Sequence, residues 1–333
     1  MPLRTALLEV NHWHTGMYAE ALKNLGVPVA AVSDADIHRA REWADQIGCR
    51  AYDCPQELLD KEQVDFVFAL APHHRMLALA SMLAKRAQPF SMEKPMALKA
   101  ERLAELVEPI ERAGMFAGVA FVRRLSGYGK ALLDRREQIG AVGHFQGRFI
   151  GGPMQRYVED GCPWMLDKRE AGGGCMMNFG THFFDLFIEM TGERVDLVFC
   201  QTSRRLHGAS AEDFSSVLLK TESGALATLE SGYLLPGEPK ENMISVSGAN
   251  AYAGNEGARW GEKPVIAYRN GKTERITDPE PNYADYTADV LRRFQADEKP
   301  LADIRAMTRV LACVNAAYES DETGKPAQPS CWI

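Results

Sequence analysis

The sequence lacks the features that mark membrane-spanning, disulfide-bonded and nucleic-acid-binding proteins. No apolar run reaches the ~18 residues that a membrane-spanning helix requires. The 7 cysteines form no Cys-x-x-Cys pair, so we expect reduced thiols and no disulfide framework. The formal net charge of −7 argues against nucleic acid or an anionic membrane as the main partner. The first residues show no signal-peptide pattern, and we expect a cytoplasmic protein.

Glycine is also missing where a dinucleotide-binding loop would use it. After the apolar run Ala6–Leu8, Glu9 and Asn11 stand at the first two glycine positions of a Gly-x-Gly-x-x-Gly pattern, and only a displaced Gly16 remains. Those glycines normally allow a tight turn and a close approach of the pyrophosphate to the backbone. A carboxylate at Glu9 would repel a diphosphate unless it is paired or points away, whereas Asn11 tolerates left-handed backbone conformations.

Other side chains near this loop are candidates for cofactor contacts. His12 and His14 can offer a proton to a phosphate. Asp34 follows the second apolar run, Val27–Ser33. At this point a dinucleotide-binding domain usually has an acidic residue that accepts the ribose hydroxyls of the adenosine. No arginine or lysine follows before Arg39, so NAD is preferred and NADP remains possible. The alternative is that Asp34 or Asp36 only caps the next helix.

The chain of 333 residues is long enough for two domains, and the first 122 residues alternate short apolar runs with amphipathic stretches. This alternation predicts an α/β Rossmann domain with a parallel sheet covered on both faces. The expected strands are Thr5–Glu9, Val27–Ser33, Val64–Leu70, Pro89–Met92 and Met115–Phe121, and the expected helices include Met17–Leu25, Ile37–Ile47, Met76–Arg86 and Ala100–Ala113.

Residues 123–333 have a different rhythm and predict an α+β domain with a large, mostly antiparallel sheet for substrate binding and oligomerisation. Ser223-Gly224 predicts a hairpin turn. The expected strands are Gly143–Phe149, Val195–Arg204, Ser215–Thr221, Leu226–Tyr233 and Met243–Ser247, followed by helices Tyr283–Ala296 and Ile304–Glu319.

Two motifs carry the candidate chemistry. Met92-Glu93-Lys94-Pro95 places a lysine just after a predicted strand, and Lys94-Pro95 is a candidate cis peptide. Gly172-Gly173-Gly174 opens a predicted helix on which Asn178, His182 and Asp185 stand at i, i+4 and i+7, and therefore on one face. A lysine and a histidine that converge on a glycine-lined opening suit proton transfer beside a hydride acceptor.

With these motifs, the chain resembles the glucose–fructose oxidoreductase / inositol dehydrogenase / rhizopine-catabolism (Gfo/Idh/MocA) family almost from end to end. The segments that carry the resemblance are Ala71-Pro72-His73-His74, Glu93-Lys94-Pro95, Ile139–Gly143, Trp164 ahead of the triple glycine, Gly180-x-His182-x-x-Asp185, Pro300–Asp303 and Ala317–Ser320.

The resemblance implies NAD(P)-dependent oxidation or reduction of a sugar, polyol or related hydroxyl compound. Lys94 matches the lysine that assists proton transfer at the reacting hydroxyl, and His182 matches the histidine that joins it. Asn178 stands where the family usually carries an aspartate; an amide orients a hydroxyl but cannot take its proton. A lysine partly desolvated beside a cationic nicotinamide can act as the base, which is typically worth ~10²–10⁴ in rate.

Five further residues are candidates, of which the resemblance places only Pro72 and His73. Pro72 and His73 lie where the cofactor passes the sheet, although a solvent-facing cap is the alternative for His73. Arg124, or its neighbour Arg123, can reach the cofactor or substrate, and one of the two forms an interdomain ion pair. Trp164 stacks on a sugar face or walls the domain junction.

Three other functions remain open from the residues alone. Glu9, Asn11 and Asn178 are compatible with a relative that cleaves glycosides without net redox. His12-x-His14 and His73-His74 could bind zinc for hydrolysis, but no acidic ligand accompanies them with persuasive spacing, so no metal is assigned. A binding protein without catalysis is the last alternative. An exposed sheet face predicts a homodimer or homotetramer, as does the resemblance.

Overall fold

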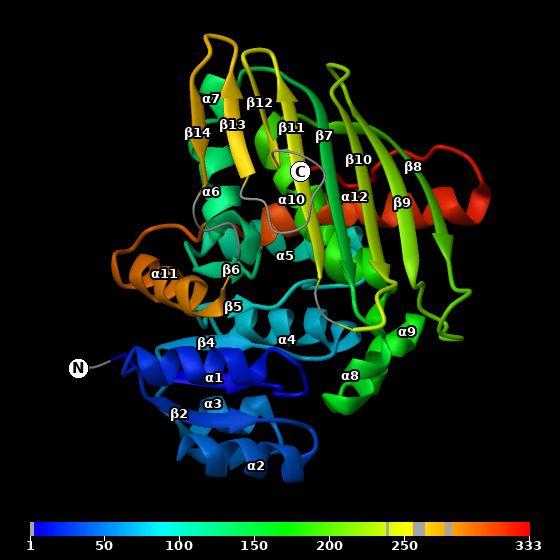
Figure 1. Ribbon diagram of the computed structural model, residues 1–333. Helices are drawn as coiled ribbons and strands as arrows, with labels where there is room; N and C mark the ends of the chain where they lie inside the picture. Colours follow the sequence, from blue (N-terminus) through cyan, green and yellow to red (C-terminus); the bar gives the residue numbers. More distant parts are fainter. Residues whose placement is uncertain (1–2, 238–239, 256–263, 277–281) are drawn as a thin grey trace. The chain divides into compact units, whose positions relative to one another are not determined.

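The computed structural model describes residues 3–237, 240–255, 264–276 and 282–333, which form two compact units (Figure 1). The first unit comprises Met1–Ala120, Tyr157–Trp164 and Tyr283–Met307, and the second comprises Phe121–Arg156, Met165–Asn282 and Thr308–Ile333. The sequence predicts a domain boundary after residue 122, which would place the segments 157–164 and 283–307 in the second domain. They join the first unit because they pack there: the ring of Tyr157, for example, lies 5.0 Å from that of Trp13.

The first unit is built on a six-stranded parallel sheet with strand order β3-β2-β1-β4-β5-β6. The bounds of its strands are β1 Thr5–Leu8, β2 Val29–Ser33, β3 Arg50–Tyr52, β4 Phe66–Ala69, β5 Phe90–Met92 and β6 Ala117–Val119. Every residue of β1 and β4 is buried, as expected for a parallel sheet with helices on both faces. The Rossmann prediction is confirmed.

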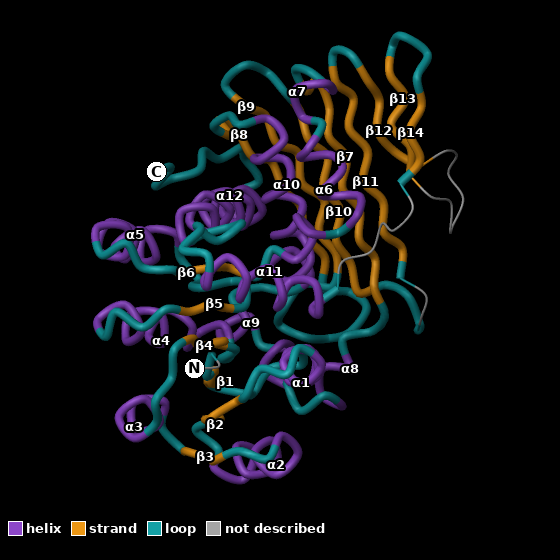
Figure 2. The backbone as a smooth tube through the Cα atoms, turned by 90° about the vertical axis from the view of Figure 1, so that its left-hand side faces the viewer, coloured by secondary structure: helices purple, strands orange, loops and turns teal. Residues whose placement is uncertain are grey.

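Helices separate these strands and cover the sheet (Figure 2). They are α1 Thr15–Asn24, α2 Ile37–Ile47, α3 Pro55–Lys61, α4 His73–Lys85 and α5 Ala100–Arg112, joined by α11 Tyr283–Gln295, which packs on α1. The cap of α2 shows how the sequence sets such an element: Asp36 accepts the N–H of His38 at 3.0 Å, and Gly48 ends the helix in a left-handed conformation.

The second unit is built on an eight-stranded sheet of order β14-β13-β12-β11-β7-β10-β9-β8. Among the strand pairs that the structure describes in it, β7 and β10 alone run parallel. The bounds of its strands are β7 Val142–Gly151, β8 Val195–Ser203, β9 Phe214–Thr221, β10 Leu226–Tyr233, β11 Glu241–Gly248, β12 Ala251–Asn255, β13 Pro264–Tyr268 and β14 Thr273–Arg275. Gly224, with φ +101°, turns the hairpin between β9 and β10, as predicted. The expectation of a mostly antiparallel sheet is confirmed.

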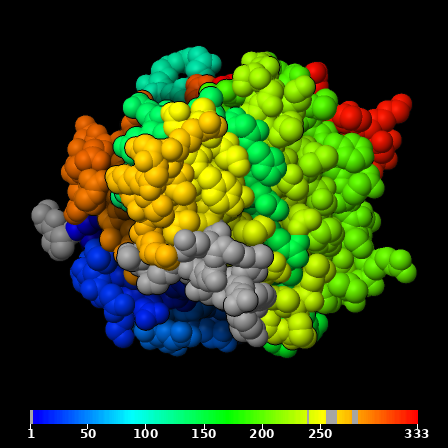
Figure 3. All heavy atoms as spheres, turned by 45° about the horizontal axis from the view of Figure 1, so that its top comes forward, coloured from blue at the N-terminus to red at the C-terminus, as the bar shows by residue number. Residues whose placement is uncertain are grey.

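One face of this sheet is covered and the other carries exposed apolar side chains. On the covered face, Gly147 of β7 lies so close to Phe183 that a Cβ would overlap its ring. On the opposite face, the strand register puts Leu218, Leu226 and Tyr252 on one side, with 53%, 48% and 46% of their surface exposed. Strands of this sheet lie at the molecular surface in Figure 3, coloured green to orange.

The remaining helical segments complete the description. These are the 3₁₀ turns Val122–Leu125 and Pro163–Leu166, a π-helical turn at Met176–Gly180, and α6 Gly127–Asp134, α7 Arg136–Ile139, α8 Gln155–Glu159, α9 Lys168–Ala171, α10 Thr181–Thr191 and α12 Ile304–Thr323. In the described part of the chain, every helix is too short or too polar to cross a bilayer.

Candidate functional site

The loop after β1 occupies the position at which an open parallel sheet binds its ligands. β1 lies between β2 and β4, and the strand order reverses direction there. Loops that follow such strands diverge at the carboxyl edge of the sheet and leave a crevice for a ligand. The loops after β1 and β4 are Glu9–His14 and Leu70–Pro72.

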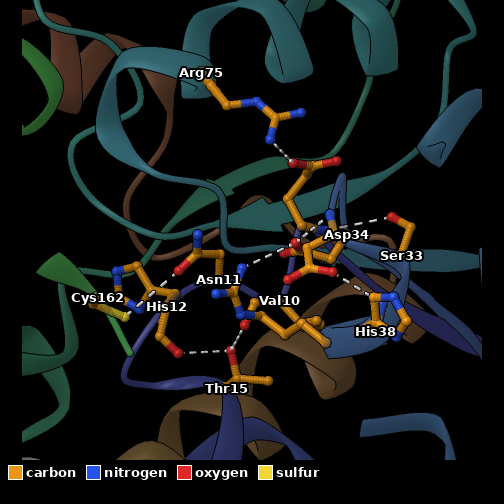
Figure 4. Close-up of polar contacts among 12 residues, drawn as sticks. Val10, Asn11, His12, Thr15, Ser33, Asp34, His38, Arg75 and Cys162 are labelled. Atoms are coloured by element: carbon orange, nitrogen blue, oxygen red, sulfur yellow. Dashed lines mark hydrogen bonds and ion pairs between the residues drawn. The ribbon is translucent and has the colours of Figure 1, made fainter. Parts of the chain in front are cut away.

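Glu9 takes the backbone conformation that glycine usually supplies at this point. Its φ is +59°, in the left-handed region, and only 2% of its surface is exposed. Arg75, at the start of α4, pairs with its carboxylate at 2.7 Å (Figure 4). Burial raises the pKa of Glu9 to about 7, against the opposing effect of Arg75. The carboxylate is therefore paired, which is the condition under which this loop remains compatible with a diphosphate.

The rest of the loop is held by short local bonds. The hydroxyl of Thr15 donates to the carbonyls of Val10 and His12 at 3.0 and 2.7 Å, which ties the loop to the start of α1 (Figure 4). The thiol of Cys162 donates to the side-chain oxygen of Asn11, with 3.8 Å between sulfur and oxygen. A Cβ on Gly16 would lie 3.4 Å from the Trp43 ring of α2, which is an ordinary contact distance, so packing here does not require glycine.

Asp34 and Asp36, the two acidic residues after β2, have separate roles. Asp36 caps α2 through the N–H of His38 (Figure 4). Asp34 is buried, and its Oδ1 accepts the N–H of Asp36 at 2.9 Å and a guanidinium N–H of Arg39 at 3.2 Å. Its Oδ2 has no hydrogen-bond partner among the described residues. Burial raises the pKa of Asp34. An orphaned carboxylate oxygen at this position fits a ribose hydroxyl.

Glu93 is the centre of a buried hydrogen-bond network in the first unit. Its Oε1 lies 3.1 Å from Nδ1 of His14 and accepts the hydroxyl of Tyr18 at 3.0 Å. The hydroxyl of Tyr283, from α11, lies 2.6 Å from the same His14 nitrogen. Burial alone would raise the pKa of Glu93, but the neighbouring His14, His12 and Lys94 together outweigh it, and the pKa is lowered. Glu93 is therefore a buried carboxylate that keeps its charge.

Lys94 follows Glu93 and is almost completely buried, with 1% of its surface exposed. Its peptide bond to Pro95 is cis, as the sequence suggested. Its ammonium nitrogen lies 5.7 Å from the centroid of the Trp13 ring, within reach of a cation–π interaction. His73 and Trp164, whose rings are 4.8 Å apart, extend the same aromatic cluster, and the buried Pro72 ends the loop before α4.

The second unit holds Asn178 and His182 on a distorted helix. Asn178 lies in the π-helical turn Met176–Gly180 and donates from its amide to the hydroxyl of Tyr233 at 3.0 Å. His182 stands in the first turn of α10, with its ring 6.0 Å from that of Phe121. The π turn adds a residue to the helical period, so the i, i+4 spacing does not align these side chains as in a regular α-helix.

The triple glycine does not line an opening. Gly172 ends α9 in a left-handed conformation, whereas Gly173 and Gly174 are buried. A Cβ on Gly173 would overlap the hydroxyl of Tyr318, and one on Gly174 would overlap the main chain of Glu212. The expectation of a glycine-lined opening is wrong, because these glycines provide close packing.

Glu212 explains why that packing is so close. Its carboxylate accepts the N–H groups of Gly174 and Met176 at 2.7 and 3.1 Å and the hydroxyl of Tyr318 at 2.9 Å. It thus satisfies the first donors of the helical segment, as a capping side chain does. Burial raises the pKa of Glu212.

Arg124 forms a buried ion pair within the second unit. Its Nε and Nη2 donate to the two oxygens of Asp185 at 2.8 and 2.5 Å, and Nη2 also lies 2.9 Å from Glu189. Burial raises the pKa of Asp185 to about 6, against the effect of Arg124. The neighbouring Arg123 donates to Asn242 at 3.0 Å. Contact of Arg124 with a cofactor stays a prediction.

The predicted site residues divide between the two units. The first unit contains Asn11, His12, His14, Gly16, Asp34, Pro72, His73, Glu93, Lys94 and Trp164, and the second contains Arg124, Asn178 and His182. Sequence reasoning missed Arg75, Tyr18 and Tyr283. Their contacts join residues that lie 66, 75 and 269 positions apart, and no local pattern signals such pairs.

Two domain families match the chain. Residues 11–121 match the oxidoreductase family with an NAD-binding Rossmann fold, and residues 130–253 match the GFO/IDH/MocA C-terminal domain. Together the two matches cover both halves of the fold described above.

Individual relatives are distant. Myo-inositol 2-dehydrogenase of Thermotoga maritima is 27% identical over 222 residues, which are 64% of each chain. D-xylose 1-dehydrogenase (NADP(+)) 2 of Haloferax volcanii is 25% identical over 303 residues, 89% of this chain and 90% of that protein. The crystal structure of an oxidoreductase from Agrobacterium radiobacter in complex with NAD+, L-tartaric acid and magnesium superposes over the whole of both chains with a TM-score of 0.86 at 20% identity.

Proposed function

This chain belongs to the Gfo/Idh/MocA oxidoreductase family, and on that premise we propose that it is an NAD-dependent dehydrogenase or reductase of a sugar, polyol or glycoside. The reaction transfers a hydride between the nicotinamide and a hydroxyl-bearing carbon of the substrate. The observation that carries this proposal is the buried Lys94 beside the carboxyl edge of a Rossmann sheet.

The residues around the first loop fit the dinucleotide. Asp34 would accept the adenosine ribose hydroxyls through its orphaned Oδ2. Arg39 pairs with that same carboxylate, so the site favours the 2′-hydroxyl of NAD, although a released Arg39 leaves NADP possible. The proposed contacts also include Asn11, His12, His14, Gly16, Pro72, His73, Glu93, Lys94 and Arg124. When bound, the nicotinamide accepts or supplies the hydride.

The protein supplies the proton transfer and the orientation of the substrate. We assign the proton of the reacting hydroxyl to Lys94, because loss of hydride from a carbinol carbon must be matched by loss of a proton from its oxygen. His182 joins this relay, and Trp164 offers a ring face to a sugar. Asn178 orients a hydroxyl through hydrogen bonds, since its amide cannot take a proton.

The first test is a titration with NADH and NADPH, followed by a screen of sugars and polyols at the nicotinamide absorbance band. We expect NADH to bind more tightly than NADPH. Replacement of Lys94 by alanine should lower kcat about 10²- to 10⁴-fold, a larger factor than any loss of NADH affinity. The matched control is Lys99→Ala, since Lys99 is an exposed lysine five positions along the chain. Failure of both nucleotides to bind, or full activity of Lys94→Ala, would contradict the proposal.

A second candidate is a net redox-neutral cleavage or elimination at a glycoside, in which oxidation is transient. Asn178, an amide where the family usually has a carboxylate, favours this alternative. The same assay separates the two reactions. Product that forms while no NADH accumulates supports the second candidate, and stoichiometric NADH supports the first.

We also propose that the chain assembles as a homodimer or homotetramer through the exposed face of the second sheet. Leu197, Leu218, Leu226 and Tyr252 share that face by strand register, and each is more than a third exposed. Light scattering during size-exclusion chromatography measures the mass, and Leu218→Lys should shift an oligomer toward the monomer.

A further inference from the structure

Three side chains of the first unit form a group with the chemistry of a metal site. His12, His14 and Glu93 each offer one ligand atom, and these three atoms all lie within 4.8 Å of one another. The two histidines come from the loop after β1, and Glu93 follows β5 directly. All three therefore stand at the carboxyl edge of the same parallel sheet. The acidic partner that the sequence did not reveal for His12 and His14 is the glutamate 79 positions after His14.

The hydrogen bonds of His12 leave one ring nitrogen without a partner. Its Nδ1 accepts the N–H of His14 at 3.2 Å. Its Nε2 is buried and has no hydrogen-bond partner in the part of the chain that the structure describes. Buried polar atoms in native proteins almost always have a partner, and leaving one unpaired has an energetic cost. A bound ion or water at this nitrogen would remove that cost.

The neighbours of the other two side chains resemble the outer shell of a metal site. The hydroxyl of Tyr18 donates to Glu93 at 3.0 Å, and the hydroxyl of Tyr283 lies 2.6 Å from Nδ1 of His14. The N–H of Lys94 donates to the second oxygen of Glu93 at 3.3 Å. Such partners fix the orientation of metal ligands and raise affinity. Here they hold a histidine and a carboxylate from distant parts of the sequence in one place.

We propose that His12, His14 and Glu93 bind one divalent transition-metal ion of the Zn²⁺, Co²⁺ or Fe²⁺ type. Imidazole nitrogens with a carboxylate suit these ions, whereas Mg²⁺ and Ca²⁺ prefer sites made of oxygen ligands. Three protein ligands leave at least one coordination position open for a water or an oxygen of a bound molecule. Aromatic rings enclose the site: the ring of Trp13 stacks on His12 at 3.9 Å between centroids.

The test is metal binding by the purified full chain without nucleotide or substrate. After treatment with a chelator, the protein is dialysed against Zn²⁺ or Co²⁺, and bound metal is measured by elemental analysis. We expect one equivalent per chain, no displacement by a large excess of Mg²⁺, and a visible absorption band for the Co²⁺ form. Absence of Zn²⁺ binding overturns the proposal and leaves a buried water as the partner of His12.

Variants establish whether these three residues are the ligands. His14→Ala and Glu93→Gln should each weaken Zn²⁺ binding at least about tenfold, since even the loss of an outer-shell partner costs 10- to 100-fold. His12→Phe keeps a ring against Trp13 and serves if another variant fails to fold, as judged by circular dichroism. The matched control is His74→Ala, because His74 is an exposed histidine of α4. Equal Zn²⁺ affinity in all folded variants would overturn the assignment.

This inference does not rest on the proposed dehydrogenase activity. His12, His14 and Glu93 are also among the proposed nucleotide contacts, so metal binding is measured without cofactor and nucleotide binding is measured on metal-free protein. Failure of one proposal therefore leaves the other standing.

Discussion

The loop after β1 and the triple glycine Gly172–Gly174 differ in what restricts their residues: the backbone conformation in the first and the space for a side chain in the second. At Glu9 a bulky residue adopts the left-handed conformation usual for glycine, with φ +59° and a buried, paired carboxylate. At Gly173 and Gly174 the backbone conformation is available to any residue, but there is no room for a Cβ. An unfavourable backbone angle costs about 1–3 kcal/mol and can be offset. Overlap with a neighbouring main chain cannot be relieved by a rotamer change.

The largest expected effect therefore follows replacement of Gly174 by alanine. The added Cβ would overlap the carbonyl oxygen of Glu212 and lie 2.7 Å from its main-chain nitrogen. We expect the free energy of unfolding, measured in urea, to fall by at least about 3 kcal/mol, the upper end of overpacking effects.

The matched control is Gly143→Ala in β7, where the nearest atom to an added Cβ is 3.6 Å away. That variant should change the free energy of unfolding by less than about 1 kcal/mol. Similar losses in both variants would show that backbone entropy, and not lack of space at Gly174, explains the requirement for glycine.

The same comparison explains what the sequence could predict. Short continuous apolar runs located β1, β2, β4, β5 and β6, because burial on both faces of the sheet requires such runs. The three-residue strand β3, Arg50–Tyr52, is partly exposed and has no buried apolar run that could reveal it. Strands β12 to β14 were not predicted either.

Long-range packing was beyond the reach of the sequence. The triple glycine looked like an opening because spacing says nothing about Glu212, which lies 38 positions after Gly174. Glu93 and Lys94 were located from their motif. Tyr283, which reaches His14 from 269 positions away, was not, since such a contact exists only in the folded chain.

The second prediction concerns the stability of the Glu9 site as a function of pH. The pKa of Glu9 is raised from 4.5 to about 7 in the folded protein, mainly by burial. A raised carboxyl pKa contributes stability that is fully present below pH 4.5 and is lost as the pH rises through 7. Glu9→Gln should remove this dependence, so the variant should gain on the order of 3 kcal/mol relative to wild type between pH 4.5 and 9.

Urea unfolding at a series of pH values measures this difference. The exposed Glu20→Gln of α1 is the control, and its curve should run parallel to that of wild type. If Glu9→Gln also runs parallel to wild type, then Arg75 compensates the burial of the carboxylate completely.

The smallest expected effect concerns the cofactor and separates charge from conformation at Glu9. Glu9→Gly removes the carboxylate and restores the residue that suits φ +59°, whereas Glu9→Gln removes only the charge. A unit charge about 4 Å from a phosphate in water is worth about 1 kcal/mol, so both variants should bind NADH roughly fivefold more tightly at pH 8. Because a protonated Glu9 carries no charge, this advantage should shrink below pH 7. Fluorescence titration of NADH at pH 6 and 8 measures both quantities.

Tighter binding by Glu9→Gly than by Glu9→Gln would show that backbone strain also opposes the cofactor. Weaker binding by both variants would instead mean that the paired Glu9–Arg75 unit supports the loop in its binding conformation.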